Sequence, residues 1–263
     1  MASFSDQPLR VAVVGLGFGV QVHVPALRAC EGLEPVALWH PSPPRLAAAC
    51  EATDLPGASS YEALLADPTV DALVLATPPE PRLPLARAAL EAGKHLLLEK
   101  PVTLSAEDAA DLQRLALQRG LTVAVDFEYR AVPLFQQLAQ LLSQGAVGTP
   151  WLVKLDWLMS SRANPSRPWS WYSQASAGGG VIGALGTHAF DMLHWLVGPT
   201  RGMHALLSTA IRERPLPGDG RMAAVDADDI ALVQLELEPP GGGVVPAQVS
   251  LASVARHGRG CWL

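Results

Sequence analysis

The stretch that most constrains this chain lies near its N-terminus, where a short apolar run breaks into alternate glycines. Residues 9–14 read Leu-Arg-Val-Ala-Val-Val, a composition typical of a buried β-strand. Gly15, Gly17 and Gly19 follow at every second position, and a helical pattern comes after them. A glycine turn between a strand and a helix offers backbone N–H groups to a phosphate. The pattern therefore predicts a nucleotide site at residues 15–19.

The length and charge of the chain limit the kinds of ligand or partner that it is expected to bind. The chain has 263 residues, enough for two domains, and a net charge of −6 from 19 basic and 25 acidic side chains. The two signs are scattered along the chain, so no basic surface for nucleic acid or for an anionic membrane is predicted. We expect a small-molecule partner.

The N-terminus and the cysteines predict a cytoplasmic protein. Residues 1–7 are too short and polar for a signal peptide, and no apolar run approaches the ~18 residues of a membrane span. Cys30, Cys50 and Cys261 are odd in number and have no metal-ligand spacing. We therefore expect reduced thiols, with no disulfide and no bound metal.

Strand and helix patterns alternate through the first half of the chain. Further strands are predicted at residues 35–39, 72–76, 95–98 and 121–125. Helices are predicted at residues 45–53, 61–66 and 83–92 and from an N-cap at Ser105 to Gly120. Such alternation requires an α/β fold with a doubly wound parallel sheet, and we assign this Rossmann domain to residues 1–126.

The loops after these strands are expected to form one crevice, because ligands of such sheets bind beyond the carboxyl ends of the strands. These loops are Gly15–Gly19, Thr77-Pro78, Glu99-Lys100-Pro101 and Asp126-Phe127. Lys100 directly follows an apolar strand and precedes a proline, so we favour a functional ammonium at the rim of the crevice. A solvated surface lysine is the alternative.

The residues after the second strand bear on the choice of cofactor. Dinucleotide-binding sheets that take NAD carry an acidic residue here, which bonds the ribose hydroxyls. This chain instead has His40, Ser42 and Arg45, which could accept a 2′-phosphate. We therefore favour NADP over NAD, although residues so close to Pro43-Pro44 could simply form a turn.

After residue 126 the pattern changes to longer, alternating strands. Residues 127–263 are interpreted as an α+β domain with a mostly antiparallel open sheet. A helix at residues 134–143 comes first, ended by Gly145. Strands are predicted at residues 151–159, 202–212, 230–238 and 244–254.

A long segment and a helix in this second domain carry candidate ligand-binding side chains. The segment at residues 160–177 contains Arg162, Arg167, Trp169, Trp171 and Tyr172. These side chains could bind a sugar-like ligand, or the segment could be a covering lid. In the helix at residues 183–197, His188 falls on a stripe with Ala184 and Met192. It is either a core histidine or a residue of the site.

The ordered set of motifs resembles the Gfo/Idh/MocA family of NAD(P)-dependent oxidoreductases, named for glucose–fructose oxidoreductase and inositol dehydrogenase. The resemblance covers nearly the whole chain. It is carried by the glycine turn, Ala76-Thr77-Pro78, Ala92-Gly93-Lys94-His95, Glu99-Lys100-Pro101, Arg130 with Pro133, Gly178-Gly179-Gly180 and Gly186-Thr187-His188-Ala189-Phe190-Asp191.

The resemblance implies that Lys100 is the active-site lysine, in contact with nicotinamide ribose and substrate, and that His188 is the active-site histidine. The family typically acts on sugars, polyols and related alcohols or ketones. Together with the loops described above, this leads to two sets of expected contacts. The cofactor contacts are Gly15, Gly17, Phe18, Gly19, His40, Arg45, Thr77, Pro78, Glu99 and Lys100, and the substrate contacts are Arg130, Arg167, Trp169 and Asp191.

Three positions differ from the family pattern. Val20 occupies the place of a glycine or alanine, and Arg82 the place of a histidine that many members carry. Ala184 stands where relatives have an aspartate four residues before the histidine. Such a carboxylate orients a histidine or stabilises its charged form. Asp191 is another acid that could serve His188, although we favour a structural role for it.

Oxidation of an alcohol needs a proton acceptor and a group that polarises the oxygen, while hydride leaves for the nicotinamide. Histidine, with a pKa near ~6.5, suits the first task, whereas lysine, near ~10.4, is a poor base at neutral pH. We therefore expect His188 to transfer the proton and Lys100 to donate a hydrogen bond to the substrate oxygen.

Two alternatives to an active oxidoreductase stay open. Ala184 favours a dinucleotide-binding sensor or partner protein without turnover. The end of the chain at Leu263, in what looks like the middle of the substrate domain, favours a truncated fragment of an active enzyme. An incomplete sheet exposes an unpaired edge, so we also expect a homo-oligomer through the second-domain sheet, or marginal stability.

Overall fold

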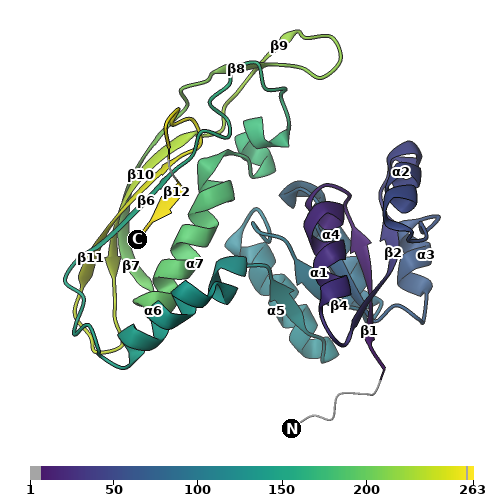
Figure 1. Cartoon of the computed structure of the whole chain (residues 1–263), viewed down its shortest axis with the longest axis horizontal. Coiled ribbons are helices and arrows are strands. Elements are labelled where there is room, and N and C mark those ends of the chain that lie inside the picture. The colour runs from purple at the N-terminus through teal and green to yellow at the C-terminus, as the bar shows by residue number, and fades with distance from the viewer. Residues whose placement is uncertain (1–6, 259) are drawn as a thin grey trace. The chain divides into compact units, whose positions relative to one another are not determined.

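A computed structural model describes residues 7–258 and 260–263 of the chain. The chain divides into two compact units, the first ending at Asp126 and the second beginning at Phe127. Each unit has its own main sheet and its own apolar core (Figure 1).

The first unit contains the predicted parallel sheet. Its strands are β1 (Leu9–Val14), β2 (Leu33–Trp39), β3 (Ala72–Leu75), β4 (His95–Leu98) and β5 (Val123–Val125). Their order is β2-β1-β3-β4-β5, and every neighbouring pair is parallel. The strand order therefore reverses direction next to β1, which is the place where a doubly wound sheet opens its ligand crevice.

Helices flank this sheet. They are the π-helical turn η1 (Gly19–His23), α1 (Val24–Ala29), α2 (Pro43–Thr53), α3 (Tyr61–Ala66), α4 (Pro79–Glu91) and α5 (Ala106–Arg119). Ser105 Oγ accepts a hydrogen bond from Asp108 N, and Gly120 adopts the left-handed conformation, so both predicted ends of α5 are confirmed. Helix α4 begins four residues before the predicted Leu83, because a proline at its first position already has a helical φ.

The central strands are buried on both faces, which explains their continuous apolar runs. Leu73 and Leu75 belong to the core cluster that includes residues of α3, α4 and α5. Val13 and Val74 belong to a second cluster, which includes residues of α1. The two clusters hold the carboxyl ends of β1 and β3 in fixed positions.

The second unit is built on a mixed sheet. Its strands are β6 (Val153–Leu158), β7 (Thr200–Ser208), β10 (Ile230–Leu237), β11 (Val245–Ala252) and β12 (Gly260–Trp262). The order is β12-β6-β11-β10-β7, with β6 and β11 parallel and the other pairs antiparallel. The predicted mostly antiparallel sheet is confirmed.

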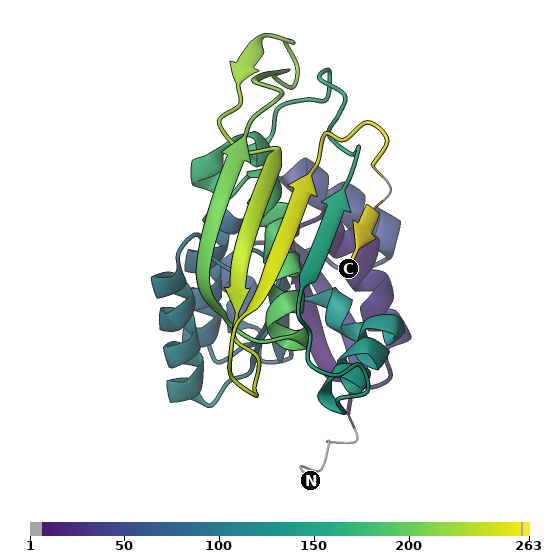
Figure 2. The same cartoon turned by 90° about the vertical axis from the view of Figure 1, so that its left-hand side faces the viewer.

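The helices of the second unit cover one face of its sheet. They are η2 (Glu128–Ala131), α6 (Pro133–Ser143), η3 (Trp171–Ser173), η4 (Ala175–Ala177), the π-helical turn η5 (Ile182–Gly186) and α7 (Thr187–Leu196). Alternate residues of β10 are buried, and Val233 and Leu235 join Met192 and Leu193 of α7 in one core. Figure 2 shows the opposite face, over which no helix of the described chain lies.

Three short strands were not predicted. Two of them, β8 (Glu213–Pro215) and β9 (Met222–Ala224), form an antiparallel hairpin, and β12 lies at the edge of the main sheet. Three-residue strands are too short to show an alternating pattern. In the described residues, no helix is both long and apolar enough to cross a membrane.

Candidate active site

The three glycines of the turn between β1 and η1 differ in what surrounds them. Gly15 has a φ of +101°, and a Cβ there would lie 2.5 Å from Ala76 O, so only glycine fits. A Cβ on Gly19 would lie 2.9 Å from Cγ1 of Val13. A Cβ on Gly17 would meet nothing within 4 Å. Gly17 therefore borders open space at the start of a helix.

This arrangement fits a pyrophosphate. The third glycine of the fingerprint lets the helix pack closely on the strand, and Gly19 performs that task here. Val20, which departs from the family pattern, is half-buried and packs beside the cluster of β1 and α1. The backbone beside Gly17 stays open to a phosphate group. Phe18, also expected at the cofactor, has an exposed side chain.

Three ionisable side chains meet beside the predicted crevice. His23 Nε2 of η1 lies 2.9 Å from Glu99 Oε1 and 3.8 Å from Asp126 Oδ2. Burial opposes ionisation of Glu99, but the hydrogen bond and the charge of His23 outweigh it and hold the pKa of this carboxyl below its usual value. Burial, and then the charge of Glu99, raise the pKa of Asp126.

These three residues are a group whose ligand atoms are close enough to hold a metal ion, since they lie within 4.8 Å of one another. The sequence predicted neither the group nor a metal. The hydrogen bond between His23 and Glu99 already explains why the two side chains adjoin. His23 is one turn away from the glycines, and a single histidine at that spacing carries no distinctive pattern.

Arg82 of α4 lies fully inside the first unit, with 1% of its surface exposed. Its guanidinium donates hydrogen bonds to the carbonyl oxygens of Thr77, Glu99 and Pro101. Burial lowers the pKa of Arg82 to about 10. The last two carbonyls flank Lys100 in sequence, so Arg82 fixes the backbone on both sides of the proposed catalytic lysine and ties it to the loop after β3.

The loop after β3 also carries a buried polar atom. Thr77 Oγ1 is buried and has no hydrogen-bond partner among the described residues. Buried hydroxyl groups are normally satisfied. Thr77, together with Pro78, was expected to contact the cofactor, and an available hydroxyl at this position is consistent with that expectation.

His40 follows β2 and lies in a groove of about 570 Å³. Its Nδ1 accepts a hydrogen bond from Ser42 N at 3.0 Å. Burial, and then the nearby charge of Arg45, lower the pKa of His40. Arg45 therefore lies close enough to influence His40, as expected for a pair that could meet a phosphate, but Glu62 also lines the same groove.

His188 lies on the first turn of α7 and is buried, with 3% of its surface exposed. Three aromatic rings surround the imidazole, with centroids 4.9 Å away for Tyr129, 5.9 Å for Phe127 and 6.1 Å for Trp157. His188 Nε2 lies 3.6 Å from Oε1 of Glu128. The sequence predicted the histidine but not the carboxylate beside it.

Arg130 and Asp191, both expected at the substrate, bind each other. Arg130 Nε and Nη2 donate to Asp191 Oδ2 and Oδ1 at 2.8 and 2.7 Å. This bidentate pair raises the pKa of Arg130, and the guanidinium lies 5.7 Å from the ring centroid of Trp195. This pairing is consistent with a structural role for Asp191, and it leaves the predicted substrate contact as a prediction.

The segment at residues 160–177 is held by contacts within its own unit. The Arg162 guanidinium lies 3.3 Å from the ring centroid of Tyr172, and burial lowers the pKa of Arg162 to about 10. Trp169 Nε1 donates to Ala224 O, and Arg167 Nη1 donates to Ser161 O. These contacts hold the segment in place, and Arg167 is exposed at its surface.

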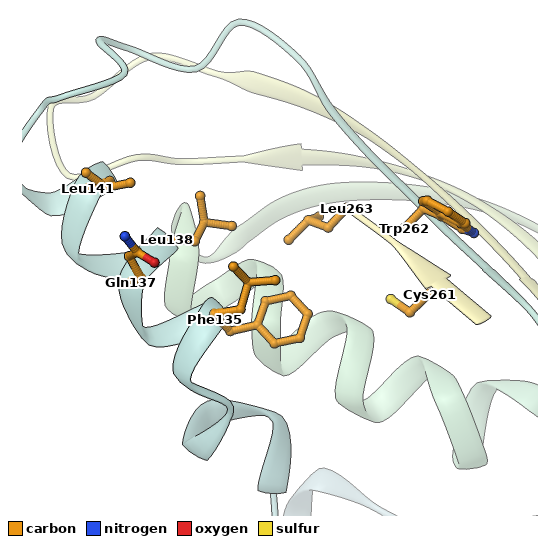
Figure 3. Close-up of a pocket in the computed structure, with 8 residues that line it drawn as sticks. Phe135, Gln137, Leu138, Leu141, Cys261, Trp262 and Leu263 are labelled. Atoms are coloured by element: carbon orange, nitrogen blue, oxygen red, sulfur yellow. The ribbon is translucent and has the colours of Figure 1, made fainter. Parts of the chain in front are cut away.

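Another cavity of the second unit, about 500 Å³ in volume, is largely apolar. Figure 3 shows side chains from α6 and from the end of β12 facing each other across this groove. Its lining residues are Leu134, Phe135, Gln137, Leu138, Leu141, Cys261, Trp262 and Leu263. Among the side chains that line the groove, the thiol of Cys261 is the ionisable one, and burial raises its pKa to about 11.

The parallel sheet, with its strand order reversing beside an open glycine turn, has the architecture of a dinucleotide-binding fold, and a second unit with its own sheet follows it in the chain. The family model described as the oxidoreductase family with an NAD-binding Rossmann fold matches residues 9–127. The model of the GFO/IDH/MocA C-terminal domain matches residues 135–262. The chain belongs to the Gfo/Idh/MocA family of oxidoreductases, as its motifs indicated.

Two relatives place the chain within this family. An uncharacterised oxidoreductase of Synechocystis sp. is 47% identical over 259 residues, which cover 97% of this chain and 68% of the relative. Levoglucosan dehydrogenase of Pseudarthrobacter phenanthrenivorans is 31% identical over 270 residues, covering 92% of this chain and 67% of that enzyme.

Solved structures agree with both the sequence matches and the fold. The apo form of a levoglucosan dehydrogenase has a TM-score of 0.87 and 28% identity, covering 97% of this chain and 70% of that one. Its complex with NADH and L-sorbose has a TM-score of 0.84 and 28% identity, covering 96% of this chain and 69% of that one.

Proposed function

We propose that this protein is an NAD(P)-dependent oxidoreductase that transfers hydride between a nicotinamide and a sugar, polyol or related alcohol or ketone. The observation that carries the proposal is the glycine turn, in which Gly15 and Gly19 have no room for a side chain while Gly17 borders open space. The names of relatives support the substrate class, since they include levoglucosan dehydrogenase and a D-xylose dehydrogenase of Paenarthrobacter nicotinovorans.

In this proposal the cofactor is held by loops of the first unit. The turn at residues 15–19 binds the pyrophosphate, the hydroxyl of Thr77 and the backbone of Pro78 border the nicotinamide half, and Glu99 and Lys100 complete the site. The bound nicotinamide supplies or accepts the hydride. Arg82 keeps the loop that carries Lys100 in one conformation, because two of its three acceptors flank that residue.

The proton is handled by side chains of the chain itself. His188 accepts the hydroxyl proton when an alcohol is oxidised and returns it when a ketone is reduced. Lys100, as an ammonium, donates a hydrogen bond to the substrate oxygen and so stabilises negative charge that develops there. Arg130, Arg167, Trp169 and Asp191 are proposed to border the substrate, with Arg130 and Asp191 acting as a pair.

NADP is the cofactor that we propose to bind more tightly. His40 and Arg45 follow β2, and the charge of Arg45 reaches His40, which suits a 2′-phosphate. Relatives differ in this respect, since the levoglucosan dehydrogenase complexes contain NADH and a xylose dehydrogenase of Haloferax volcanii is named for NADP(+).

Titration of the protein with NADPH and with NADH tests the preference for NADP, and Arg45→Ala should abolish that preference. Equal affinities in both proteins would contradict it.

The function is tested with a pair of glycine variants. Gly17→Ala places a methyl group where the phosphate should approach, so we expect the Kd for NADPH to rise at least about tenfold, with no loss of thermal stability. Gly241→Ala is the matched control, because its Cβ also meets nothing within 4 Å but lies in a loop of the second unit. Unchanged NADPH binding in Gly17→Ala would disprove the assignment of the site.

Turnover is then tested with a panel of sugars and polyols, followed by the absorbance of reduced nicotinamide. Lys100→Met and His188→Gln should each lower kcat by about 10²-fold or more while NADPH still binds. A rate that survives both substitutions would show that the chemistry lies elsewhere.

A dinucleotide-binding sensor without turnover is the second candidate, and the observation that favours it is Ala184 in place of the family aspartate. Tight NADPH binding with no turnover on any tested sugar, polyol or ketone would support this candidate.

A further inference from the structure

We propose that Glu128 is the positioning residue of His188, and that it supplies the negative charge that Ala184 cannot. The inference rests on the proposed function, in which His188 transfers the substrate proton. The observation that carries it is the approach of Glu128 Oε1 to within 3.6 Å of His188 Nε2. The carboxylate comes from a different element than the helix that carries the histidine.

The turn that presents Glu128 is well fixed. Glu128 begins the short helix η2, which is closed by hydrogen bonds from Arg130 N to Phe127 O and from Val132 N to Tyr129 O. The rings of Phe127 and Tyr129 meet the imidazole edge-on. One turn of chain therefore supplies both the rings that orient His188 and the carboxylate that faces its Nε2.

Asp191 does not compete for this role. It belongs to α7, three residues after His188, and both of its oxygens accept hydrogen bonds from Arg130. Its charge is thereby neutralised by a guanidinium within its own unit. The acid that we considered as a substitute for the family aspartate is thus engaged elsewhere, whereas Glu128 lies beside the imidazole.

Several described elements of the second unit that pack in the same core as α7 carry no ionisable side chain. Helix α6, the turn η5 and strand β11 contain no ionisable side chains. On β6, Lys154 and Asp156 pair with each other at 3.1 Å and alternate with Trp157, whose ring faces the histidine. Glu236 of β10 lies at an exposed position of that strand.

Tyr129, whose ring contacts the imidazole, is itself ionisable, and burial followed by the charge of Glu128 raises the pKa of its hydroxyl. Two further ionisable groups belong to the same unit. The thiol of Cys261 stays neutral because its pKa is raised to about 11. Asp228 Oδ2 accepts a hydrogen bond from Ile182 N at the start of η5, more than a turn before His188. Neither group replaces the charge of Glu128.

The protonation states expected for His188 and Glu128 follow from how differently the two side chains are buried. His188 is 3% exposed, and burial favours the neutral imidazole. Glu128 is 46% exposed, so water keeps its carboxylate ionised. A negative charge this close favours the imidazolium and makes His188 a stronger proton acceptor. At 3.6 Å the pairing is electrostatic and longer than a hydrogen bond.

The experiment compares Glu128→Gln, Glu128→Asp and the control Glu236→Gln in the full chain. The first readout is the titration of the His188 ring by NMR, assigned with His188→Gln, which needs no substrate. Glu128→Gln should lower the pKa of His188 by about 0.5 to 1, given the exposure of the carboxylate. Glu128→Asp should restore part of the difference, and Glu236→Gln should leave the titration unchanged.

The second readout is the pH profile of kcat for whichever substrate turns over. Because the base must be neutral to accept a proton, the rate rises with pH through the pKa of His188. In Glu128→Gln this limb should move to lower pH and its plateau should fall about three- to tenfold, with KM nearly unchanged. A loss of rate without movement of the limb would indicate a purely structural role and overturn the proposal.

Ala184→Asp provides the internal check. An aspartate there would give His188 a second carboxylate, so Glu128→Gln should have a smaller effect on the titration in that background than in the wild type. Equal effects in both backgrounds would contradict replacement of one acid by the other.

If His188 titrates as expected but no substrate turns over, the pairing stands and the proposed function fails. If turnover occurs and the titration does not move, Glu128 has no such role.

Discussion

Arg82 shows how much a single side chain contributes to the candidate site. It is buried, and it joins three backbone carbonyls from the loops after β3 and β4. Arg82→Met would fill similar space but leave those carbonyls without donors. We expect a loss of about 3 kcal/mol and a fall in Tm of roughly 10 °C, measured by thermal unfolding.

The matched control for this prediction is Arg87→Met on the same helix. Its guanidinium is partly exposed and lies 3.9 Å from Asp111, a surface pairing that contributes little. Equal Tm values for the two variants would show that the buried hydrogen bonds of Arg82 do not stabilise the loops.

Cysteine reactivity gives a second prediction at the residue scale. Burial raises the pKa of the Cys261 thiol from 9.0 to about 11, which lowers its thiolate fraction at neutral pH about a hundredfold. Cys30 is exposed. We expect iodoacetamide to label Cys30 at least tenfold faster than Cys261, as measured by peptide mass spectrometry. Faster labelling of Cys261 would contradict the burial of its thiol.

Some residues of the candidate site could be proposed from the sequence and others could not, for a physical reason. The local sequence pattern singles out Lys100, which lies between a strand and a proline. It also singles out His188, which lies on an apolar helical stripe. Arg82, His23 and Glu128 gain their contacts from residues distant in the chain, for example the 76 positions between His23 and Glu99. A single charged residue in a helix or turn carries no sign of such a partner.

At the scale of elements, the cluster of His23, Glu99 and Asp126 joins η1 to the ends of β4 and β5, and it predicts a pH dependence. The pKa of Glu99 is held below its ordinary value of 4.5. Its stabilising effect is therefore present above that pH and is lost as the pH falls through the folded-state pKa. The raised pKa of Asp126 acts in the opposite direction, since its contribution is lost as the pH rises.

His23→Gln removes the charge that lowers the Glu99 pKa. We expect the midpoint of acid unfolding to move up by roughly 0.5 pH unit, measured by circular dichroism between pH 2 and pH 6. His204→Gln, at an exposed position of β7, is the control and should leave the midpoint in place. If His23→Gln and His204→Gln both keep the acid-unfolding midpoint of the wild type, His23 does not stabilise the ionised form of Glu99.

Most regular elements were predictable because their patterns are long. The predicted helix 61–66 and strand 95–98 match α3 and β4 residue for residue, and the caps of α5 agree with Ser105 and Gly120. The π-helical turns η1 and η5 were not predicted, and both stand directly before a longer helix. Their side chains follow the same apolar spacing as an α-helix, so periodicity cannot separate the two over five residues.

At the scale of the whole molecule, the second sheet has one face that no described helix covers (Figure 2). Leu206 of β7 and Leu232 of β10 are directly paired on this face and are 65% and 48% exposed. Contiguous exposed apolar side chains mark association sites. We expect the protein to self-associate through this face, as the sequence suggested.

Sedimentation velocity tests this expectation. The double variant Leu206→Glu and Leu232→Glu should sediment as a smaller species than the wild type. Leu117→Glu on α5, where the leucine is 74% exposed, is the control and should sediment as the wild type does. A wild-type monomer that stays monodisperse at high concentration would rule the association out.

The parallel pair in the second sheet also sets an order of events during synthesis. Strand β6 pairs with β11, where Val153 faces Ala247, 94 positions later (247 − 153). Strands of the first unit find partners made sooner, such as β1 with β2 from Leu9 to Leu33. During synthesis on the ribosome, β6 cannot pair with β11 until β11 has emerged, and the apolar face of β6 stays exposed until then. Contacts so distant in sequence slow folding, so we expect the second unit to complete its sheet later than the first.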